Sequence, residues 1–134
     1  MKIRKANKED VKDCLEIQEL DRKISFKASD LKEAIKNKDV IFVVGEEGQK
    51  VIGYTLGFVD PCMRNDVLIS ETRVDRRFRK KGIGTQLVQA FCKECFKRNK
   101  KSVVALIKSE HLKFYVGSCK FKKRTSWIDV VRKK

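Results

Sequence analysis

The sequence predicts one α/β (α+β) domain, in which strands and helices alternate along 134 residues. Two continuous apolar runs, Val40–Val44 and Val103–Ile107, are typical of strands that are buried on both faces of a sheet. Between them, a strongly periodic helix begins near Gly84. The length suits a single domain with a sizeable core, and no repeat or low-complexity linker divides the chain.

The first third of the chain is predicted to form a strand, two helices and a second strand. The first strand covers Met1–Lys5. Asn7 is the expected N-cap of a helix that ends near Leu20, because its side chain can accept a bond from the first turn. Ser29 is the expected cap of a second helix, and the apolar run Val40–Val44 follows as a buried strand.

The middle of the chain is predicted to form a hairpin and then a third long strand. Glu46–Gln49 supplies the turn of the hairpin, and Lys50–Val59 is its second strand, which two glycines interrupt. A loop over Pro61–Asn65 leads into the strand Asp66–Val74.

The long helix has the clearest periodicity in the chain, because its apolar residues recur at steps of four with a second apolar row beside the first. Another buried strand follows over 102–107, and a short helix runs over about 109–116. Cys119–Phe121 and Thr125–Val131 are predicted to pair as a final hairpin, which completes the order β-α-α-β-β-β-α-β-α-β-β. The two apolar rows of the long helix consist of Ile83, Leu87, Phe91 and Cys95, and of Val88, Cys92 and Phe96.

A basic, glycine-bearing loop joins the strand that ends at Val74 to the long helix. The free backbone N–H groups and the dipole of a helix N-terminus attract negative charge. Gly82 and Gly84 have no Cβ, so the backbone can approach a phosphate closely. The loop therefore predicts a phosphate site, and further positive charge comes from Arg79, Lys80 and Lys81.

The spacing Arg79-x-x-Gly82-x-Gly84 resembles the acyl-CoA pyrophosphate signature Q/R-x-x-G-x-G/A of the GNAT superfamily of N-acetyltransferases. Val74 stands five residues before Arg79, where that family ends its fourth strand. The resemblance covers essentially the whole chain. It implies one GNAT domain over residues 1–134, with a mixed sheet of six to seven strands and about four helices.

The same resemblance implies the chemistry. Acetyl-CoA would be the co-substrate, and its acetyl group would pass to a primary amine of a small molecule or a protein by direct attack in a ternary complex. In this family the fourth and fifth strands splay apart, which frees backbone groups for the thioester and the pantetheine. By position, the residues that would hold acetyl-CoA are Thr72, Arg73, Val74, Arg79, Lys80, Lys81, Gly82, Ile83, Gly84 and Thr85.

Tyr115 is the expected general acid, because the family commonly places a tyrosine near the CoA sulfur after the fifth strand. A phenol with a pKa of about 10 can protonate a departing thiolate at neutral pH. The alternative is a half-buried core tyrosine with a satisfied hydroxyl. The family pattern N-x-x-A-x-x-x-Y-x-x-x-G-F is changed here: Lys108, His111 and Lys120 replace the Asn, the Ala and the Gly, and one extra residue separates Tyr115 from Phe121.

Glu71 is the expected general base, working through a water, because it lies on the fourth strand three residues before Val74. A salt bridge is the alternative role, and several relatives carry their acid one residue earlier, where this chain has Ser70. His111, four residues before Tyr115, would share its helix face and is a second base or a surface histidine. The fifth strand has no carboxylate, unlike that of ribosomal-protein acetyltransferases, which disfavours an N-terminal α-amine acceptor of that type.

The five cysteines do not suggest a disulfide framework, because their number is odd. Cys92-Lys93-Glu94-Cys95 has metal-ligand spacing, yet it falls within a helix without a second ligand pair, which favours small buried side chains and no metal. The sequence contains no run of 18 apolar residues, which a membrane-spanning helix would need. Met1–Lys5 leads into polar residues and lacks the apolar stretch of a signal peptide. The expected location is the cytoplasm.

The net charge of +15 indicates an acidic partner or a solvated lysine-rich surface. The phosphates of acetyl-CoA account for part of it, and the rest is expected along the whole chain with a cluster near the C-terminus. Two other functions stay open: a non-catalytic acyl-CoA sensor, and a nucleic-acid-binding protein on the same fold. The walls of the acceptor pocket are expected over 22–30 and 60–66. The positive charge favours neutral or acidic acceptors. The protein is expected to be a monomer or a homodimer.

Overall fold

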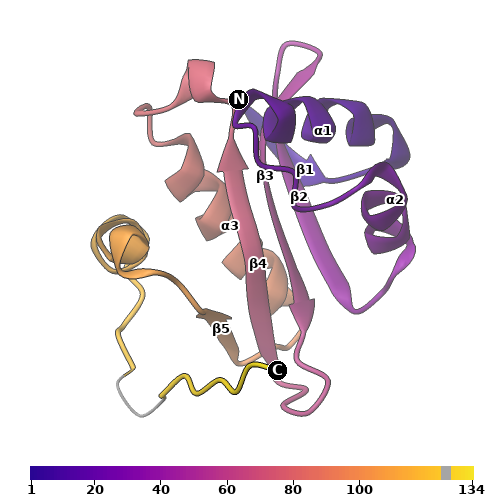
Figure 1. Cartoon of the computed structure of the whole chain (residues 1–134). Coiled ribbons are helices and arrows are strands. Elements are labelled where there is room, and N and C mark those ends of the chain that lie inside the picture. The colour runs from indigo at the N-terminus through magenta and orange to yellow at the C-terminus, as the bar shows by residue number, and fades with distance from the viewer. Residues whose placement is uncertain (125–127) are drawn as a thin grey trace.

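Five strands form one mixed sheet in the order β1-β2-β3-β4-β5 in the computed structural model, which describes residues 1–124 and 128–134 (Figure 1). β1 to β4 pair antiparallel in sequence order, and β5 pairs parallel with β4 because α3 crosses over between them. The strands are β1 (Lys2–Lys5), β2 (Val40–Glu47), β3 (Lys50–Val59), β4 (Asp66–Val74) and β5 (Ser102–Ala105).

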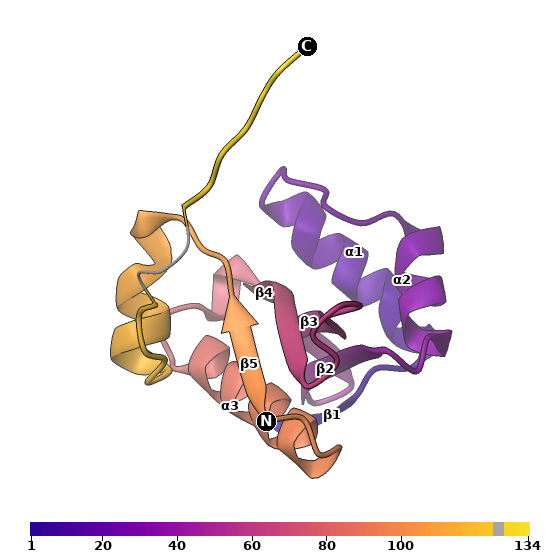
Figure 2. The ribbon, with the colours of Figure 1, turned by 90° about the horizontal axis from the view of Figure 1, so that it is seen from below.

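Helices cover both faces of the sheet, with α1 (Val11–Leu20) and α2 (Ala28–Lys36) on one side and α3 (Ile83–Lys97) on the other (Figure 2). The side chains of β2 alternate accordingly. Ile41 and Val43 pack with α3, whereas Phe42 and Val44 pack with α1 and α2. Short 3-10 turns cover Lys8–Asp10 (η1), Arg76–Phe78 (η2) and Ser109–His111 (η3), and a π-helical turn covers Lys113–Ser118 (η4).

The glycine at position 57 marks a close approach of β3 to α3. A Cβ there would lie 2.6 Å from the ring of Phe91 and 2.5 Å from the carbonyl oxygen of Leu68. Phe91 is fully buried, and burying a phenylalanine contributes about 1.5–3 kcal/mol. β3 continues through Gly57, and the absence of a side chain there lets α3 pack closely onto the sheet.

Of the two N-caps that the sequence predicts, Asn7 is confirmed and Ser29 is wrong. Asn7 accepts the N–H of Glu9 at 2.9 Å, and so caps the 3-10 turn that leads into α1. Ser29 is not the cap of α2, because the helix begins at Ala28 and Lys27 takes the N-cap position. The carboxylate of Asp30 closes this turn by accepting the N–H of Lys27 at 2.9 Å.

The predicted α+β arrangement, a mixed sheet with helices on both faces, is confirmed, but the described residues form five strands and not six or seven. Cys119–Phe121 makes no strand, because its backbone bonds to η4: the N–H of Cys119 donates to the Phe114 carbonyl and that of Phe121 to the Tyr115 carbonyl, both at 2.9 Å. The other expected strand of the hairpin was Thr125–Val131, of which residues 125–127 lie outside the described residues. Residues 128–134 form an extended segment that projects away from the body (Figure 2).

Two smaller expectations also fail. β5 ends at Ala105 and not at Ile107, and Leu106 is largely exposed. Phe96 does not join the apolar face of α3, because 52% of its surface is exposed near the end of that helix. In the described part of the chain no helix is long and apolar enough to cross a membrane.

Candidate functional site

One edge of β4 is open over its last five residues. The ladder between β4 and β5 pairs Asp66–Ile69 with Ser102–Ala105 and then stops. Over Ser70–Val74, β4 keeps β3 on one side and, among the described residues, has no strand on the other. Unpaired N–H and C=O groups of a strand can bind an extended ligand that carries amides.

A β-bulge decides which way the side chains of this open segment point. Leu56 of β3 pairs with Glu71 and Gly57 pairs with Ile69, so Ser70 is the extra residue. The bulge moves Glu71 off the α3 side that Ile69 faces. Glu71 and Arg73 then point towards α1 and α2, and Thr72 and Val74 point towards α3.

On the α3 side, Tyr115 lies against the open segment. It is 8% exposed, and its hydroxyl donates a long bond of 3.5 Å to Oγ1 of Thr72. Oγ1 of Thr72 lies 3.1 Å from that of Thr55. Phe114 and Phe121 flank the Tyr115 ring, with centroids at 4.9 and 5.5 Å. Burial raises the pKa of Tyr115 and outweighs the bond to Thr72, which lowers it, so the phenol keeps its proton at neutral pH.

The π-helical turn explains how Tyr115 reaches this position. The bond from Cys119 N–H to the Phe114 carbonyl spans five residues and not the four of an α-helix. The turn therefore absorbs one additional residue between Tyr115 and Phe121, which is the insertion that the sequence shows. Tyr115 still faces Thr72, and Phe121 still packs on Tyr115.

On the α1/α2 side, Glu71 and Arg73 belong to an ionic network. The guanidinium of Arg73 is mostly buried; it donates to Oε1 of Glu71 at 3.2 Å and to the Ser25 hydroxyl at 2.8 Å. Its Nη1 also lies 3.6 Å from Asp21. Tyr54, fully buried, donates a short hydrogen bond to Oε2 of Glu71. The ion pair expected as the alternative role of Glu71 is therefore present.

The loop between β4 and α3 begins with a buried carboxylate. Asp75 accepts the backbone N–H of Arg77 at 2.9 Å and its guanidinium at 3.0 and 2.6 Å, and this pairing lowers the pKa of Asp75. Arg79, the first residue of the glycine motif, donates to the Val74 carbonyl at 3.1 Å and to Asp21 at 2.6 Å. Asp21 thus links the motif to the network around Arg73.

The two glycines of the motif have different structural roles. Gly82 has φ +77°, and a Cβ there would meet no atom within 4 Å, so the space in front of the helix is open. A Cβ on Gly84 would lie 3.2 Å from the ring of Phe114, so Gly84 lets η4 pack on the first turn of α3. Lys80 and Lys81 are exposed, and Lys81 lies 5.7 Å above the ring of Phe78.

The N-terminus of α3 fits a diphosphate. Its first intrahelical bond runs from the Gln86 N–H to the Gly82 carbonyl at 3.1 Å. The N–H groups of Ile83, Gly84 and Thr85 precede that bond and have no intrahelical acceptor. Three such donors beside an open left-handed glycine and exposed lysines suit the charge and shape of a pyrophosphate.

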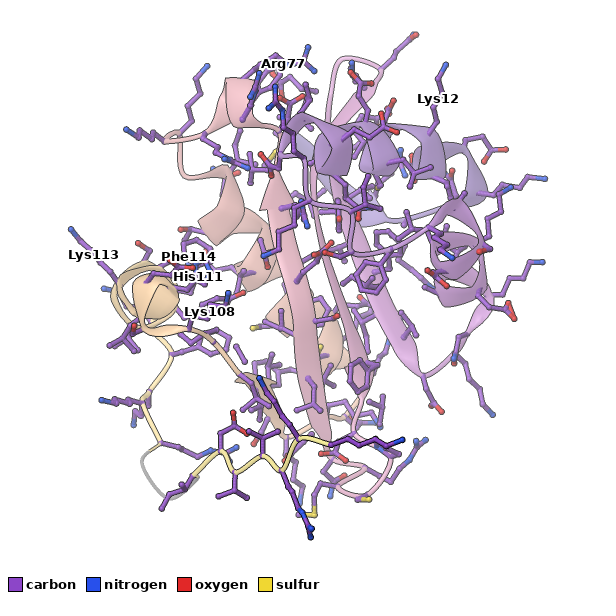
Figure 3. The ribbon with its side chains drawn as sticks, viewed as in Figure 1. Lys12, Arg77, Lys108, His111, Lys113 and Phe114 are labelled. Atoms are coloured by element: carbon purple, nitrogen blue, oxygen red, sulfur yellow. The ribbon has the colours of Figure 1, made fainter. Side chains whose placement is uncertain are left out.

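His111 does not share a face with Tyr115. The expected single helix is divided into η3 and η4, so His111 is 57% exposed while Tyr115 is buried. Figure 3 shows His111 and Lys108 beside the last helical turns, where Nε2 of His111 lies 3.4 Å from Glu110. This pair is too exposed to hold a histidine in a fixed catalytic position.

The cysteines on α3 are protonated thiols. Burial raises the pKa of Cys92 to about 11 and that of Cys95 to about 12. Since the thiolate is both the metal ligand and the nucleophile, neither residue is prepared for such a role. Within the described ranges no group of three or more His, Cys, Asp or Glu residues could hold a metal ion.

Comparison with known proteins is consistent with this geometry. The model of the acetyltransferase (GNAT) family matches residues 6–119. No curated protein sequence matches the chain significantly. Solved structures resemble the chain, but their sequence identities to it are 20% or less, so the resemblance shows only the fold.

Three of these structures show the range of relatives. Glucosamine-6-phosphate N-acetyltransferase from Arabidopsis thaliana has a TM-score of 0.76 and 20% identity over 97% of each chain. Ribosomal-protein-alanine N-acetyltransferase from Brucella melitensis has a TM-score of 0.76 and 11% identity over 100% of each. An aminoglycoside acetyltransferase from an uncultured soil metagenomic sample has a TM-score of 0.74 and 14% identity, over 98% of this chain and 96% of that one. The family model covers most of the sequence, and the chain therefore belongs to the GNAT acetyltransferase family.

Proposed function

We propose that this protein transfers the acetyl group of acetyl-CoA to a primary amine by direct attack in a ternary complex. The main support is the continuity of two features. The open edge of β4 at Ser70–Val74 is followed, after the loop of residues 75–82, by the α3 N-terminus, where Gly82 leaves room for a phosphate. An extended pantetheine with a diphosphate at one end fits a strand edge followed by an anion site.

In this proposal acetyl-CoA is held by the residues of these two features. Backbone groups of Thr72, Arg73 and Val74 serve the acetyl and pantetheine part. The pyrophosphate takes the segment from Arg79 to Thr85, which comprises Arg79, Lys80, Lys81, Gly82, Ile83, Gly84 and Thr85. A backbone N–H at the open edge would also stabilise the negative charge that develops on the thioester oxygen during attack.

Tyr115 is the proposed general acid. Its hydroxyl lies on the α3 side of the open segment and keeps its proton at neutral pH, because burial raises its pKa. A thiolate that leaves from a thioester at this edge would take that proton. The bond to Thr72 is long, so the hydroxyl can turn towards the sulfur at little cost.

Glu71 is the proposed general base, and it acts through a water. It lies on the other side of β4 from Tyr115, so base and acid flank the open edge. The amine would then approach from the side of the α1–α2 connection, while the leaving sulfur faces α3. Tyr54 donates to one carboxylate oxygen of Glu71 and Arg73 donates to the other. The water would therefore bind to the lone pairs of these oxygens that remain free.

The acceptor is proposed to be neutral or acidic, because the long-range field of a protein with a net charge of +15 disfavours polycations, even though residues 1–75, which include the α1–α2 connection, are themselves almost neutral. The names of the three relatives refer to a sugar phosphate, an aminoglycoside and a ribosomal protein. Acceptors thus vary widely among proteins of this fold, and a screen for turnover should include amines of each kind.

Thermal melting with acetyl-CoA tests the proposal, with ATP at equal ionic strength as the control for polyanions. A ligand at about a hundred times its Kd stabilises the native state by roughly 2.7 kcal/mol, so we expect a rise of several degrees with acetyl-CoA alone. Equal rises with both ligands, or none with either, would contradict an acetyl-CoA site.

Substitution of Gly82 locates the site. Gly82→Glu places a carboxylate against the pyrophosphate, and we expect a loss of the acetyl-CoA shift with the fold retained, because a Cβ there meets no atom within 4 Å. Gly82→Gln is the matched control, since it has the same size and the same backbone strain at φ +77°. If both variants bind acetyl-CoA equally well, the anion does not lie at Gly82.

A further inference from the structure

The positive charge of this protein is not spread evenly along the chain. Residues 1–75 contain 14 Lys and Arg and 15 Asp and Glu, so they are almost neutral. Residues 76–134 contain 19 Lys and Arg and only three Asp and Glu. The division falls just after β4, and the excess charge of the whole protein therefore belongs to the loop, α3, β5, the last helical turns and the C-terminal segment.

This division along the chain is also a division in space. α1 and α2 cover one side of the sheet, and α3 and η4 share the core on the other side (Figure 2). Figure 3 shows Lys113 of η4 pointing outward, on the opposite side of the view from Lys12 of α1. The six exposed lysines on or beside α3 and η4, which we call the basic face, are Lys93, Lys97, Lys101, Lys108, Lys113 and Lys120.

The lysines of the basic face are not neutralised within the molecule. None of the six forms an ion pair in the described part of the chain. In the loop, by contrast, Arg77 and Arg79 are paired with acids that come from before residue 76. Uncompensated charges of one sign on one side of a molecule repel each other, and a polyanion that binds there relieves this repulsion.

Acetyl-CoA would not account for the basic face. Its proposed phosphate site is the first turn of α3, whereas Lys93 and Lys97 lie on the last turns, and ten residues of α-helix rise by about 15 Å. Near these lysines the helix also exposes an aromatic ring, because Phe96 is 52% exposed. An exposed ring beside lysines is an arrangement on which an unpaired base can stack while the ammonium groups contact the phosphates.

We propose that the basic face binds single-stranded nucleic acid, with Phe96 as a stacking platform. The lysines contact successive phosphates without regard to sequence, so the affinity depends steeply on salt. Duplexes bind less well, because their bases are not available to Phe96. This binding is separate from acetyl transfer and does not depend on the proposed enzyme activity.

Fluorescence anisotropy of labelled 20-nucleotide RNA and DNA single strands, measured at several salt concentrations, tests the proposal. For wild-type protein we expect log Kd to rise with log salt, with about 0.7 unit of slope for each phosphate contacted. Lys93→Glu/Lys97→Glu should raise Kd at least about tenfold and lower the slope by about 1.4. Phe96→Ala should raise Kd at least about fivefold and leave the slope unchanged.

The matched control is Lys12→Glu/Lys32→Glu, which changes the net charge equally but on α1 and α2. Circular dichroism and the acetyl-CoA melting shift should be unchanged in all variants, because neither lysine pair lies at the proposed site. Equal losses in both charge variants would overturn the proposal, since net charge alone would then explain binding. Displacement of the strand by one equivalent of acetyl-CoA, or binding to anionic lipid vesicles but not to oligonucleotides, would also overturn it.

Discussion

The two sides of β4 hold their polar groups in opposite ways. On the α3 side, Thr55, Thr72 and Tyr115 form a line of uncharged hydroxyls in an apolar surrounding. On the α1/α2 side, Glu71 and Arg73 form a charged network that extends to Asp21 and Arg79. The bulge at Ser70 separates the two sets, because without it Glu71 would face α3.

This difference shows how one strand can keep a proton donor and a carboxylate a few residues apart. Burial without a charged neighbour favours the neutral form of Tyr115. Glu71, in contrast, is paired with Arg73 and accepts a hydrogen bond from Tyr54. Groups that meet opposite environments can serve as acid and base at one pH. If the proposal is correct, changes on the two sides should affect different kinetic properties.

The largest expected effect is on the α3 side. Tyr115→Phe keeps the ring packed between Phe114 and Phe121 and removes only the hydroxyl. We expect kcat to fall by about 10² to 10³, because the thiolate then leaves without a proton, and the acetyl-CoA affinity to change less than about twofold. Thiol release and the melting shift measure the two quantities.

Equal losses of turnover and affinity in Tyr115→Phe would make Tyr115 a binding or packing residue. An unchanged kcat would mean that solvent or another group protonates the thiolate. In either case the contrast between the two sides would lose its catalytic meaning.

A smaller effect is expected on the α1/α2 side. Glu71→Gln keeps the shape of the side chain and can still accept from Tyr54, but it cannot take up a proton. We expect kcat to fall about tenfold, because water still carries part of the proton transfer, with no loss of acetyl-CoA affinity. Rates with one amine acceptor over a range of pH measure this effect.

Arg73→Lys is the matched control for Glu71→Gln, because it weakens the same network and leaves the carboxylate in place. Its melting temperature should fall, while its rate with saturating acceptor stays close to that of the wild type. If Arg73→Lys loses as much rate as Glu71→Gln, Glu71 acts by holding the network together and not as a base.

The parts of the site that sequence could predict are local in the chain. Arg79, Gly82 and Gly84 lie close together in the sequence where the loop meets α3, so their spacing already indicates an anion site at a helix start. The faces of Glu71 and Thr72 depend on the bulge at Ser70, which forms between two strands and leaves no local pattern. Only the pairing of β3 with β4 reveals it.

The C-terminal region shows a second limit of prediction. The insertion before Phe121 was visible in the sequence, and a π-helical turn is one way to absorb it. Cys119–Phe121 alternates apolar and charged side chains, and so short an alternation fits a strand as well as a turn. The sequence therefore predicts a hairpin where the backbone in fact bonds to η4. The uneven charge could be counted from the sequence, but only the fold shows that it gathers on one side of the sheet.

The smallest effect concerns the two tyrosines, which have raised pKa values for partly different reasons. Burial is the main cause for both, and the negative charge of Glu71 further raises the pKa of Tyr54 only. Absorbance at 295 nm should therefore show less tyrosinate in the folded protein at pH 10 than in the unfolded chain, whose tyrosines are about half ionised there. Because the folded values are raised, the related stability is complete below about pH 10 and is lost as the pH rises further.

Two variants separate the two causes. The protein contains two tyrosines, so Tyr115→Phe reports Tyr54 alone. Adding Glu71→Gln to that variant should lower the pKa of Tyr54, since the neighbouring charge is gone. Thr72→Val should instead raise the pKa of Tyr115, because it removes the hydrogen bond that lowers it. Tyr54→Phe reports Tyr115 alone in the same way. If Glu71→Gln shifts Tyr115 in that variant as much as it shifts Tyr54, the two sides of β4 are not electrostatically separate, and the assignment of acid and base to opposite sides fails.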